Sequence, residues 1–366
     1  MAIIEELVSL PTPALVIDAA KVRANIDRLA DYAAARGIKI RPHTKTHKLR
    51  RLAHMQLDAG AVGIAVAKVT EAEAISDPEQ DVFVAYPPIG EGRADRLAAL
   101  ARDRIMRAAV DSLAAIEATA AASKAAGTTV GLLVDLDVGL GRTGVPTPAD
   151  TLTLAQAIDR DPHLRLDGLM IYPGQVWSKP NEQSAELKAV DDLIVETLAL
   201  WAKHGLRAAI ISGGSTPTAY QTHLTPHVTE MRPGTYVFND MNTVRPGFAS
   251  IDDCAARVVA TVISDAVPGQ VVVDAGSKTL ARDASSVPDG GFGHVVEYPQ
   301  ARIKQLSEEH GQVDVRACDP RPQLGERVTI IPNHICPCVN LHAAVWWREP
   351  GQPLEQIPVD ARGCIR

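Results

Sequence analysis

The sequence lacks long apolar runs, clusters of basic residues and a regular set of cysteines, and each absence excludes a class of protein. No stretch approaches about 18 consecutive apolar residues without a charge or a chain breaker, so we expect no membrane-spanning helix. Asp and Glu number 44 against 37 Lys and Arg, which gives a formal net charge of −7. Because no long Lys/Arg run occurs either, we expect no nucleic-acid partner.

The five cysteines are odd in number and unevenly spread, which does not fit a disulfide framework. The first twenty residues, MAIIEELVSLPTPALVIDAA, carry acidic residues early and lack the basic start and cleavage site of a signal peptide. Both observations favour a cytoplasmic protein. The composition, 46% hydrophobic and 22% charged, is that of an ordinary globular enzyme. The length of 366 residues corresponds to two domains or one large one.

Short apolar runs alternate with Ala-rich amphipathic stretches over the first two thirds of the chain. ALVID (14–18) predicts a strand, and the next stretch has the apolar spacing of a helix that ends at Gly37. Such strand–helix alternation with near-continuous apolar strands predicts a buried parallel sheet. Eight or so units over about 240 residues favour an α/β fold with a (β/α)8 TIM-type barrel; an open doubly wound sheet is the alternative. The further predicted strands are KIRPH, GIAVA, VFVAYP, RIMRAAVDS, VGLLVDLDVG, LRLDGLMIYPG and AAIISGG.

The pattern changes near Phe238, where helical periodicity nearly disappears and β-rich runs take over. ARVVATVIS, GQVVVDAG, RVTIIPN and AAVWWRE are separated by Pro and Gly, which predicts a mostly-β domain. We therefore expect a barrel domain over residues 1–244 and a C-terminal β domain over residues 245–366. The first ten or so residues can join the β domain.

Functional residues of such a barrel lie at the C-terminal ends of the strands. The second predicted strand ends in RPHTKTHK, which places Lys45 and Lys48 close together. A lysine in a strand-end pocket can form a Schiff base with an aldehyde, whereas the alternative for a lone lysine is a basic loop in solvent. The sixth predicted strand ends in DVGLGRTGV, where glycines let a ligand approach the backbone beside Arg142.

The eighth predicted strand ends in SGGSTPT, and MRPGTY follows it. Backbone N–H groups and hydroxyls in such a loop can surround a phosphate, although Gly-Ser loops are also common turns. A Schiff-base lysine, an arginine and a strand-end phosphate site in one barrel are what pyridoxal phosphate needs. The residues expected around the phosphate are Gly213, Gly214, Ser215, Thr216, Gly234 and Tyr236.

These motifs occur in the order of one known family. They are TPALVID, RPHTKTHK, VDLDVGLGRTGV, GGSTPT, RPGTYVF, VVDAG and PNHICPCVNLH. The chain resembles the D-serine dehydratase / D-threonine aldolase family, fold-type III pyridoxal-phosphate enzymes with the architecture of alanine racemase. The resemblance implies that Lys45 carries the cofactor, that Arg142 binds its phenolic oxygen and that Tyr172 lines the pocket. It also implies a D-amino acid substrate and a homodimer whose active sites combine the barrel of one subunit with the β domain of the other.

Arg232 occupies the position at which racemases of this fold place an arginine against the pyridine nitrogen. A permanent positive charge there disfavours protonation of that nitrogen, so the ring becomes a poorer electron sink. The alternative for Arg232 is a surface salt bridge before a turn.

PNHICPC follows the predicted strand RVTIIP and suggests a metal site. His334 and Cys336 are two residues apart, so on an extended strand both side chains point to the same face. Imidazole and thiolate together favour zinc. We leave Cys338 out because Pro337 disturbs the strand. A structural role is the alternative for an isolated pair, but the resemblance implies that His334 and Cys336 are ligands of a catalytic metal.

The family contains two reactions on D-β-hydroxy amino acids. A dehydratase gives a keto acid and ammonia, whereas an aldolase cleaves the Cα–Cβ bond. The resemblance favours the dehydratase, because Cys336 stands where the aldolases carry Asp and because Ser178 stands where they carry a histidine. An aldolase is the main alternative. Manganese or magnesium is the alternative to zinc as the metal. A racemase, a pyridoxal-phosphate carrier without turnover and a plain metal hydrolase are less favoured. An acidic substrate would need a further cation, for which Arg245 and Arg282 are candidates.

Overall fold

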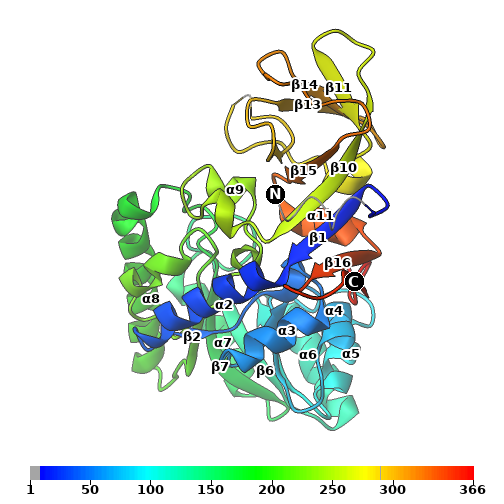
Figure 1. Ribbon diagram of the computed structural model, residues 1–366. Helices are drawn as coiled ribbons and strands as arrows, with labels where there is room; N and C mark the ends of the chain where they lie inside the picture. Colours follow the sequence, from blue (N-terminus) through cyan, green and yellow to red (C-terminus); the bar gives the residue numbers. More distant parts are fainter. Residues whose placement is uncertain (1–8, 289) are drawn as a thin grey trace. The chain divides into compact units, whose positions relative to one another are not determined.

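The computed structural model describes residues 9–288 and 290–366. They form two compact units, both drawn in Figure 1. The barrel unit comprises residues 27–45, 49–234 and 363–366. The β unit comprises residues 9–26 and 46–48 and the described residues within 235–362. Neither unit is therefore a single continuous stretch of chain.

The barrel unit is built on eight parallel strands in the order β2-β9-β8-β7-β6-β5-β4-β3. The ring closes between β2 and β3, where His43 forms a parallel bridge with Ala65. Nearby, the Val62 N–H donates to the Ile40 carbonyl at 2.9 Å. This closure confirms the predicted barrel over the open sheet. The strands are β2 (Lys39–Ile40), β3 (Ile64–Val66), β4 (Asp81–Val84), β5 (Ile105–Val110), β6 (Val130–Leu136), β7 (Leu164–Ile171), β8 (Ile210–Gly213) and β9 (Glu230–Met231).

Helices connect these strands, and their ends follow local sequence signals. The Ser112 side chain accepts the Ala115 N–H at the start of α6, which ends at Gly127 in the left-handed conformation. Thr147 caps α7 in the same way, and Pro148 occupies its first turn. The helices are α2 (Ala19–Ala34), α3 (Arg50–Asp58), α4 (Val69–Ile75), α5 (Arg93–Leu100), α6 (Leu113–Ala126), α7 (Pro148–Asp159) and α8 (Ser184–Lys203). The 3-10 helices η1 (Thr44–Thr46), η2 (Pro180–Glu182) and η3 (Ala219–Leu224) lie in loops.

Every second residue of the barrel strands points to the interior, and these side chains form layers. The middle layer is apolar and contains Phe83, Ala109, Leu133 and Met170, which are buried together. Each comes from a different neighbouring strand, from β4 to β7. This layer is the floor on which strand-end residues can form a site.

Toward the N-terminal ends of the strands the interior is charged. Arg41, 2% exposed, pairs with Glu230 at 2.9 Å and with Asp81 at 2.8 Å. Arg107 also pairs with Asp81, at 2.7 Å, and with Asp167, at 2.9 Å. Removing one partner from such a buried pair typically costs about 3–5 kcal/mol, because the other charge is left uncompensated. These pairs therefore bind β2, β4, β5, β7 and β9 to one another.

The β unit contains a nine-stranded sheet with the path β13-β14-β11-β10-β1-β16-β17, to which β15 and β12 are attached beside β10. Its pairs are antiparallel except for β1 with β16. The strands are β1 (Ala14–Asp18), β10 (Ala256–Ser264), β11 (Gln270–Val273), β12 (His294–Val295), β13 (Arg302–Leu306), β14 (Gly311–Asp314), β15 (Arg327–Ile331), β16 (Ala344–Arg348) and β17 (Glu355–Pro358). The helices are η4 (Thr235–Val237), α9 (Met241–Val244), η5 (Ile251–Asp253), α10 (Ser277–Leu280) and α11 (Ile335–Leu341).

The first predicted strand, ALVID, forms as β1, but its assignment to the barrel was wrong. It pairs with β10 and β16 in the sheet of the β unit. KIRPH therefore contributes the first barrel strand, and β9 is the eighth. An apolar strand that leads into a helix has the same local pattern in either sheet, so the sequence did not reveal its partner.

The two units divide the chain at residues other than 244. Residues 9–26 and 235–244 belong to the β unit. The predicted barrel domain over residues 1–244 and β domain over residues 245–366 stay a prediction. The remainder of the N-terminal stretch expected to join the β domain, residues 1–8, lies outside the described residues.

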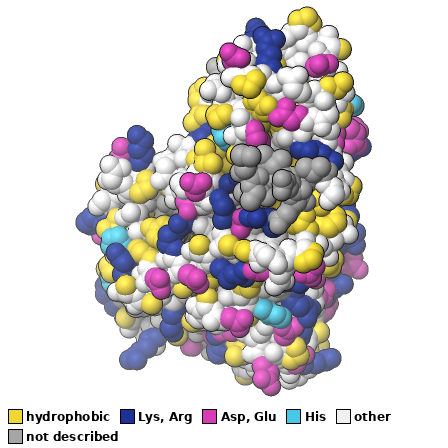
Figure 2. Space-filling model, viewed as in Figure 1, with side chains coloured by type: hydrophobic (Ala, Val, Ile, Leu, Met, Phe, Trp, Pro, Cys, Tyr) yellow, Lys and Arg dark blue, Asp and Glu magenta, His cyan; other side chains and the backbone are white. Residues whose placement is uncertain are grey.

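In the described part of the chain, no helix combines the length and the apolar character that crossing a membrane requires. On the face drawn in Figure 2, Lys and Arg side chains are interspersed with Asp and Glu side chains. This mixture of charges on the visible face gives no sign of a continuous basic surface there.

Candidate active site

A cavity of about 260 Å³ lies in the barrel unit at the C-terminal ends of the strands. Four residues predicted to serve the cofactor line it together: Lys45, Arg142, Tyr172 and Arg232. They follow or end different strands and are far apart in sequence, so the barrel fold brings them together. The other lining residues are His43, Ala67, Ala85, Tyr86, Pro87, Thr143 and Met170.

Lys45 and Lys48 lie in different environments. Lys45, in η1 directly after β2, is partly exposed to the cavity. Lys48 is 5% exposed, has a φ of 54°, and its ammonium donates to the Ala361 carbonyl at 3.3 Å within the β unit. Lys45 is therefore the lysine of this motif that lines the cavity.

Arg142 lies on a loop that is held by carboxylates. Asp137 accepts N–H groups of Gly139, Leu140 and Gly141 at 3.0–3.1 Å, and Asp135 accepts the Thr143 hydroxyl at 2.9 Å. The Arg142 guanidinium carbon lies 4.5 Å from the centroid of the Tyr172 ring. Stacking on an aromatic ring orients a guanidinium without neutralising it, so Arg142 can still bind an anion.

Arg232, which follows β9, is buried, so the alternative of a surface salt bridge was wrong. Its Nη2 donates to the Ile171 carbonyl at 2.8 Å. Its Nη1 is buried without a partner among the described residues. Burial lowers the pKa of Arg232 to about 10 despite the nearby carboxylates of Glu230 and Asp135, so the side chain stays charged at neutral pH. A buried charged donor without a partner fits a ligand acceptor, such as a pyridine nitrogen.

The residues predicted to hold the phosphate follow two adjacent strands, β8 and β9. Gly214 has a φ of 78°, and a Cβ there would lie 3.2 Å from the Cβ of Met231, so the chain needs glycine. The Ser215 N–H, one of the donors predicted for the phosphate, donates to the Thr218 hydroxyl at 3.0 Å and is therefore already used within the loop. None of Gly213, Gly214, Ser215, Thr216 and Gly234 is among the residues that line the 260 Å³ cavity.

Tyr236, His334 and Cys336 belong to the β unit. Tyr236 is buried in η4. The strand geometry expected for the metal pair was wrong, because β15 ends at Ile331 and His334 precedes α11 as its N-cap residue. Cys336 and Pro337 lie in the first turn of α11, where proline is tolerated because the first N–H groups have no helical partner.

The side chains of His334 and Cys336 nevertheless interact with each other. The Cys336 sulfur lies 3.3 Å from the Thr46 hydroxyl and 3.6 Å from the Thr235 hydroxyl. The His334 Nδ1 lies 2.6 Å from a carboxylate oxygen of Asp283. A carboxylate on one imidazole nitrogen orients the other nitrogen, an arrangement typical of metal-binding histidines.

Negative charge gathers around His334. Burial lowers its pKa, but the Cys336 thiol and the carboxylates of Asp240 and Asp283 outweigh burial and raise it to about 9. Asp240 is itself buried, which raises its pKa to about 6, and it accepts the Ile335 N–H at 3.0 Å. No group of three or more His, Cys, Asp or Glu side chains in residues 9–288 and 290–366 is arranged to hold a metal ion. Imidazole and thiolate are ligands that zinc accepts, so the chemistry of His334 and Cys336 fits a metal with two protein ligands and open positions.

Three other residues named from the sequence have different surroundings. Cys338 is buried, and its sulfur lies 3.2 Å from the Thr279 carbonyl. Arg245 donates to Ser285, to Asn333 and to the Gly290 carbonyl. Arg282 is exposed. Neither arginine lines the cavity of the barrel unit.

The sequence reasoning missed residues on both units. Tyr86 and Thr143 line the cavity, Asp135 holds its Arg142 loop, and Asp240 and Asp283 surround His334. A signal existed for Asp135, because it is two residues after Leu133 on β6 and so shares its inward face. No comparable signal existed for Asp283, which is distant from His334 in the chain.

Comparison with known proteins identifies the family of this chain. Residues 17–242 match the family described as "Alanine racemase, N-terminal domain", and residues 255–347 match the "Putative serine dehydratase domain". The chain is 30% identical to a D-threonine aldolase of Arthrobacter sp. over 99% of this chain and 95% of that protein. The chain belongs to the D-serine dehydratase / D-threonine aldolase family.

Other members of the family are equally similar. A D-threo-3-hydroxyaspartate dehydratase of Delftia sp. (strain HT23) is 32% identical over 91% of this chain and 92% of that protein. The crystal structure of D-threonine aldolase from Filomicrobium marinum has a TM-score of 0.90 at 31% identity and covers 98% of both chains. Dehydratases and aldolases of the family are therefore about equally close to this chain.

Two solved structures bear on the histidine–cysteine pair. They are a cysteine-to-alanine mutant of D-threo-3-hydroxyaspartate dehydratase in the metal-free form and a histidine-to-alanine mutant of the same enzyme. Their mutated positions are two residues apart, the same spacing as His334 and Cys336.

Asp135 gives the barrel unit a predicted pH dependence. Burial raises the pKa of this carboxyl to about 6 from 3.8, even though the Thr143 hydroxyl and the charges of Arg232 and Arg142 oppose the shift. The folded state therefore binds this proton more tightly than the unfolded state, and the stabilisation is lost as the pH rises through about 6. Between pH 5 and pH 7.5, deprotonation of the Asp135 carboxyl should lower the free energy of unfolding by about 1.4 kcal/mol.

We therefore expect the free energy of unfolding of Asp135→Asn to gain about 1.4 kcal/mol relative to the wild type between pH 5 and pH 7.5, measured by urea unfolding at both values. The exposed Asp95→Asn on α5 is the matched control and should keep the wild-type pH profile. A constant difference between Asp135→Asn and wild type across this range would show that Asp135 does not titrate there.

Proposed function

We propose that this chain is a pyridoxal-phosphate- and metal-dependent lyase that dehydrates D-β-hydroxy amino acids to a keto acid and ammonia. One observation carries the proposal: Lys45, Arg142 and the unpartnered Nη1 group of Arg232 face one cavity at the strand ends of a barrel. Family membership supports the same class, since the relatives named above are lyases of such substrates.

The cavity residues suit pyridoxal phosphate in charge and in hydrogen bonding. Lys45 would hold its aldehyde carbon, Arg142 its phenolic oxygen and Arg232 its pyridine nitrogen. The loops after β8 and β9, with Gly213, Gly214, Ser215, Thr216, Gly234 and Tyr236, would hold its phosphate. The cofactor, when bound, withdraws electrons from the α-carbon of the substrate.

Arg232 limits how much charge that ring can accept. Its guanidinium remains charged at neutral pH and can only donate, so it favours an unprotonated pyridine nitrogen. Tyr172 keeps Arg142 stacked beside the cavity, and Asp135 holds the loop of Arg142 through Thr143. Lys45 and Tyr172 are the candidates for proton transfer at the α-carbon.

His334 and Cys336 would hold the metal, and Asp283 would orient His334. Imidazole and thiolate favour zinc; manganese or magnesium is the alternative. The metal, when bound, takes up negative charge on the departing hydroxyl, an effect worth several kcal/mol. Two protein ligands leave room for substrate oxygens.

The identity of Cys336 is the main reason to propose dehydration and not retro-aldol cleavage. The aldolase alternative expects Asp at this position and a histidine near Ser178. Here the Ser178 hydroxyl donates to Glu186, and no histidine stands in YPGQVWSK. Cleavage to glycine and an aldehyde remains the second candidate because an aldolase is about as similar to this chain as a dehydratase.

We further propose a cytoplasmic homodimer with shared active sites. None of the five cysteines, all within the described residues, forms a disulfide, as a reducing compartment favours. The shared site follows from the family resemblance, and sedimentation of the holoenzyme measures the dimer directly.

The dehydration itself is tested with a panel of D- and L-serine, D- and L-threonine and 3-hydroxy-D-aspartate. We expect ammonia and a keto acid from D-substrates alone, because the cofactor and metal residues can fit only one configuration at the α-carbon. Glycine plus an aldehyde would decide for the aldolase, and equal turnover of L-substrates would contradict the proposed stereochemistry.

Lys45 is expected to carry the cofactor and Lys48 is not. Borohydride reduction of the holoenzyme followed by peptide mapping should place the pyridoxyl label on Lys45, because Lys48 is buried and bonded to the Ala361 carbonyl. Lys45→Ala should abolish the label. A label on Lys48 in the wild type would overturn the assignment.

Loss of the metal is expected to remove dehydration but not the cofactor. EDTA treatment and Cys336→Ala should each lower kcat by at least about 100-fold, since metal stabilisation of the leaving group is worth several kcal/mol. The cofactor absorption should persist in both samples. Cys338→Ala is the control, because its sulfur contacts the Thr279 carbonyl, and it should keep both metal and activity. Full activity in metal-free samples would make the pair structural.

A further inference from the structure

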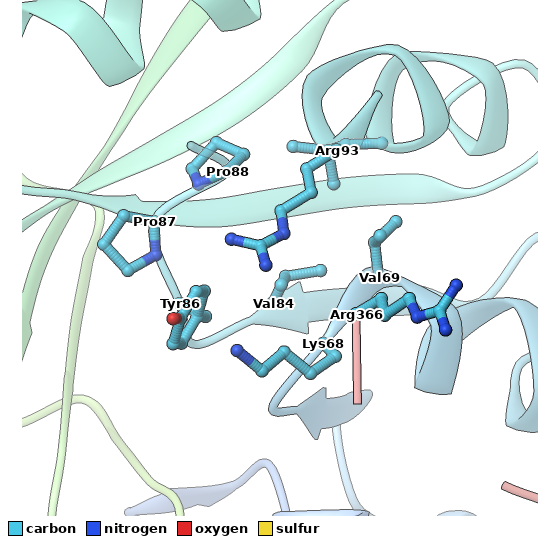
Figure 3. Close-up of a pocket in the computed structure, with 9 residues that line it drawn as sticks. Lys68, Val69, Val84, Tyr86, Pro87, Pro88, Arg93 and Arg366 are labelled. Carbon is cyan, nitrogen blue, oxygen red and sulfur yellow. The ribbon is translucent and has the colours of Figure 1, made fainter. Parts of the chain in front are cut away.

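Both units carry cations that have no role in binding the cofactor, and two cases differ in what surrounds them. In the pocket drawn in Figure 3, Lys68 and Arg93 point toward the ring of Tyr86. This pocket has a volume of about 10 Å³, which is room for one water molecule and not for an organic ligand. Arg245 of the β unit instead joins separate segments of the chain.

Three hydrogen bonds join α9 and its C-cap residue, Arg245, to the two residues that precede His334. Two of them come from backbone N–H groups in the first turn of α9, which donate to the Pro332 carbonyl at 3.1 Å and to the Asn333 carbonyl at 3.0 Å. In the third, the Arg245 Nη1 donates to the Asn333 Oδ1 at 2.8 Å. The segment that carries the predicted metal-binding histidine is therefore fixed to this helix.

Arg245 also binds the loop on which Asp283 lies (residues 281–288, called here the Asp283 loop). Its Nη1 donates to the Ser285 hydroxyl at 2.6 Å, and its Nη2 donates to the Gly290 carbonyl, beyond the loop, at 2.8 Å. Asn333 adds a further contact, because its Nδ2 donates to the Asp283 carbonyl at 3.1 Å. One guanidinium thus connects the Asp283 loop to the segment of the metal pair.

The Asp283 side chain needs such support because it lies in contact with solvent. Its carboxylate is 2.6 Å from the His334 Nδ1, although the two side chains are 47% and 41% exposed. An exposed pair on an unsupported loop gains little free energy, since ordering both side chains costs entropy. Ala281, at the start of the loop, has a φ of 63°, which a residue with a Cβ adopts only where its surroundings impose it. The contacts of the loop therefore hold it in one conformation.

We propose that Arg245 is a positioning residue of the metal site. Through Ser285 and Asn333 it holds the Asp283 loop, and the Asp283 carboxylate is thereby kept on the Nδ1 of His334. The inference rests on the proposed lyase function and adds a residue on which its metal site depends. Loss of the carboxylate behind a metal-binding histidine typically lowers metal affinity about 10- to 100-fold. Loss of Arg245 should act in the same direction, because the carboxylate is then no longer held in place.

The proposal is tested by the zinc affinity of the metal-free holoenzyme, measured by competition with a chromophoric chelator. Arg245→Met keeps most of the side-chain length and should weaken zinc binding about 10-fold. Arg245→Lys keeps the charge but cannot reach three acceptors with one planar group, so it should not restore the affinity. Ser285→Ala removes a single bond and should weaken binding less than Arg245→Met. Arg316→Met, at an exposed arginine paired with Asp314, is the matched control and should keep the wild-type affinity.

A double-mutant cycle separates positioning from a general loss of structure. If Arg245 acts through Asp283, Arg245→Met and Asp283→Ala should each weaken zinc binding about 10-fold, and the double variant should also weaken it only about 10-fold. An additive loss of about 100-fold, or wild-type affinity in Arg245→Met, would overturn the proposal. Where Arg245→Met does not fold, Ser285→Ala takes its place in the cycle, and wild-type affinity there has the same meaning.

Failure of the proposed lyase function gives a different result, because zinc affinity is measured without substrate. Turnover of none of the D-amino acids, together with a non-additive loss in the cycle, would contradict the lyase function and support the role of Arg245. If zinc binding by the wild type is absent or survives His334→Ala, the metal site is wrong and the role of Arg245 is wrong with it.

Discussion

The candidate active site depends on the buried guanidinium of Arg232. Glu230, two residues earlier, lies near it but is already paired with Arg41 and accepts the Ser212 hydroxyl at 2.6 Å. Burying a charge without full pairing costs free energy. The Ile171 carbonyl satisfies Nη2, while Nη1 faces no protein acceptor in the described chain. The barrel thus keeps a charged donor with unused capacity in its cavity, which is typical of a ligand site and not of a stabilising contact.

Side chains alternate between the two faces of each barrel strand, and this alternation points both the core residues and Arg232 to the barrel interior. On β9 the inward positions lead from Glu230 in the charged layer to Arg232 at the cavity. On β6 they lead from Leu133 in the apolar layer to Asp135, which holds the Arg142 loop. A slip of one residue in either strand would turn these side chains outward. The same register that packs the barrel therefore orients the residues predicted to bind the cofactor.

This pattern explains what the sequence could predict. The (β/α)8 barrel, the mostly-β domain and the grouping of Lys45, Arg142, Tyr172 and Arg232 followed from strand spacing and the family motifs. Two features could not be predicted from the sequence: that β1 belongs to the sheet of the β unit, and that His334 lies at the start of a helix. The pairing partner of a strand and the residue at which β15 ends are decided by contacts with residues distant in sequence.

His334 and Cys336, the predicted metal ligands, show how contacts between residues distant in sequence replace the expected local geometry. The N-cap position and the first turn of a helix both lie at its end, so His334 and Cys336 can approach each other from the start of α11. Asp240 accepts the Ile335 N–H there, which compensates a backbone group that has no helical partner. On the other side of the pair, the Asp283 carboxylate binds the His334 imidazole. Asp283 thus holds the His334 imidazole and Asp240 the start of α11, and the helix end brings together two side chains that were expected to meet on a strand.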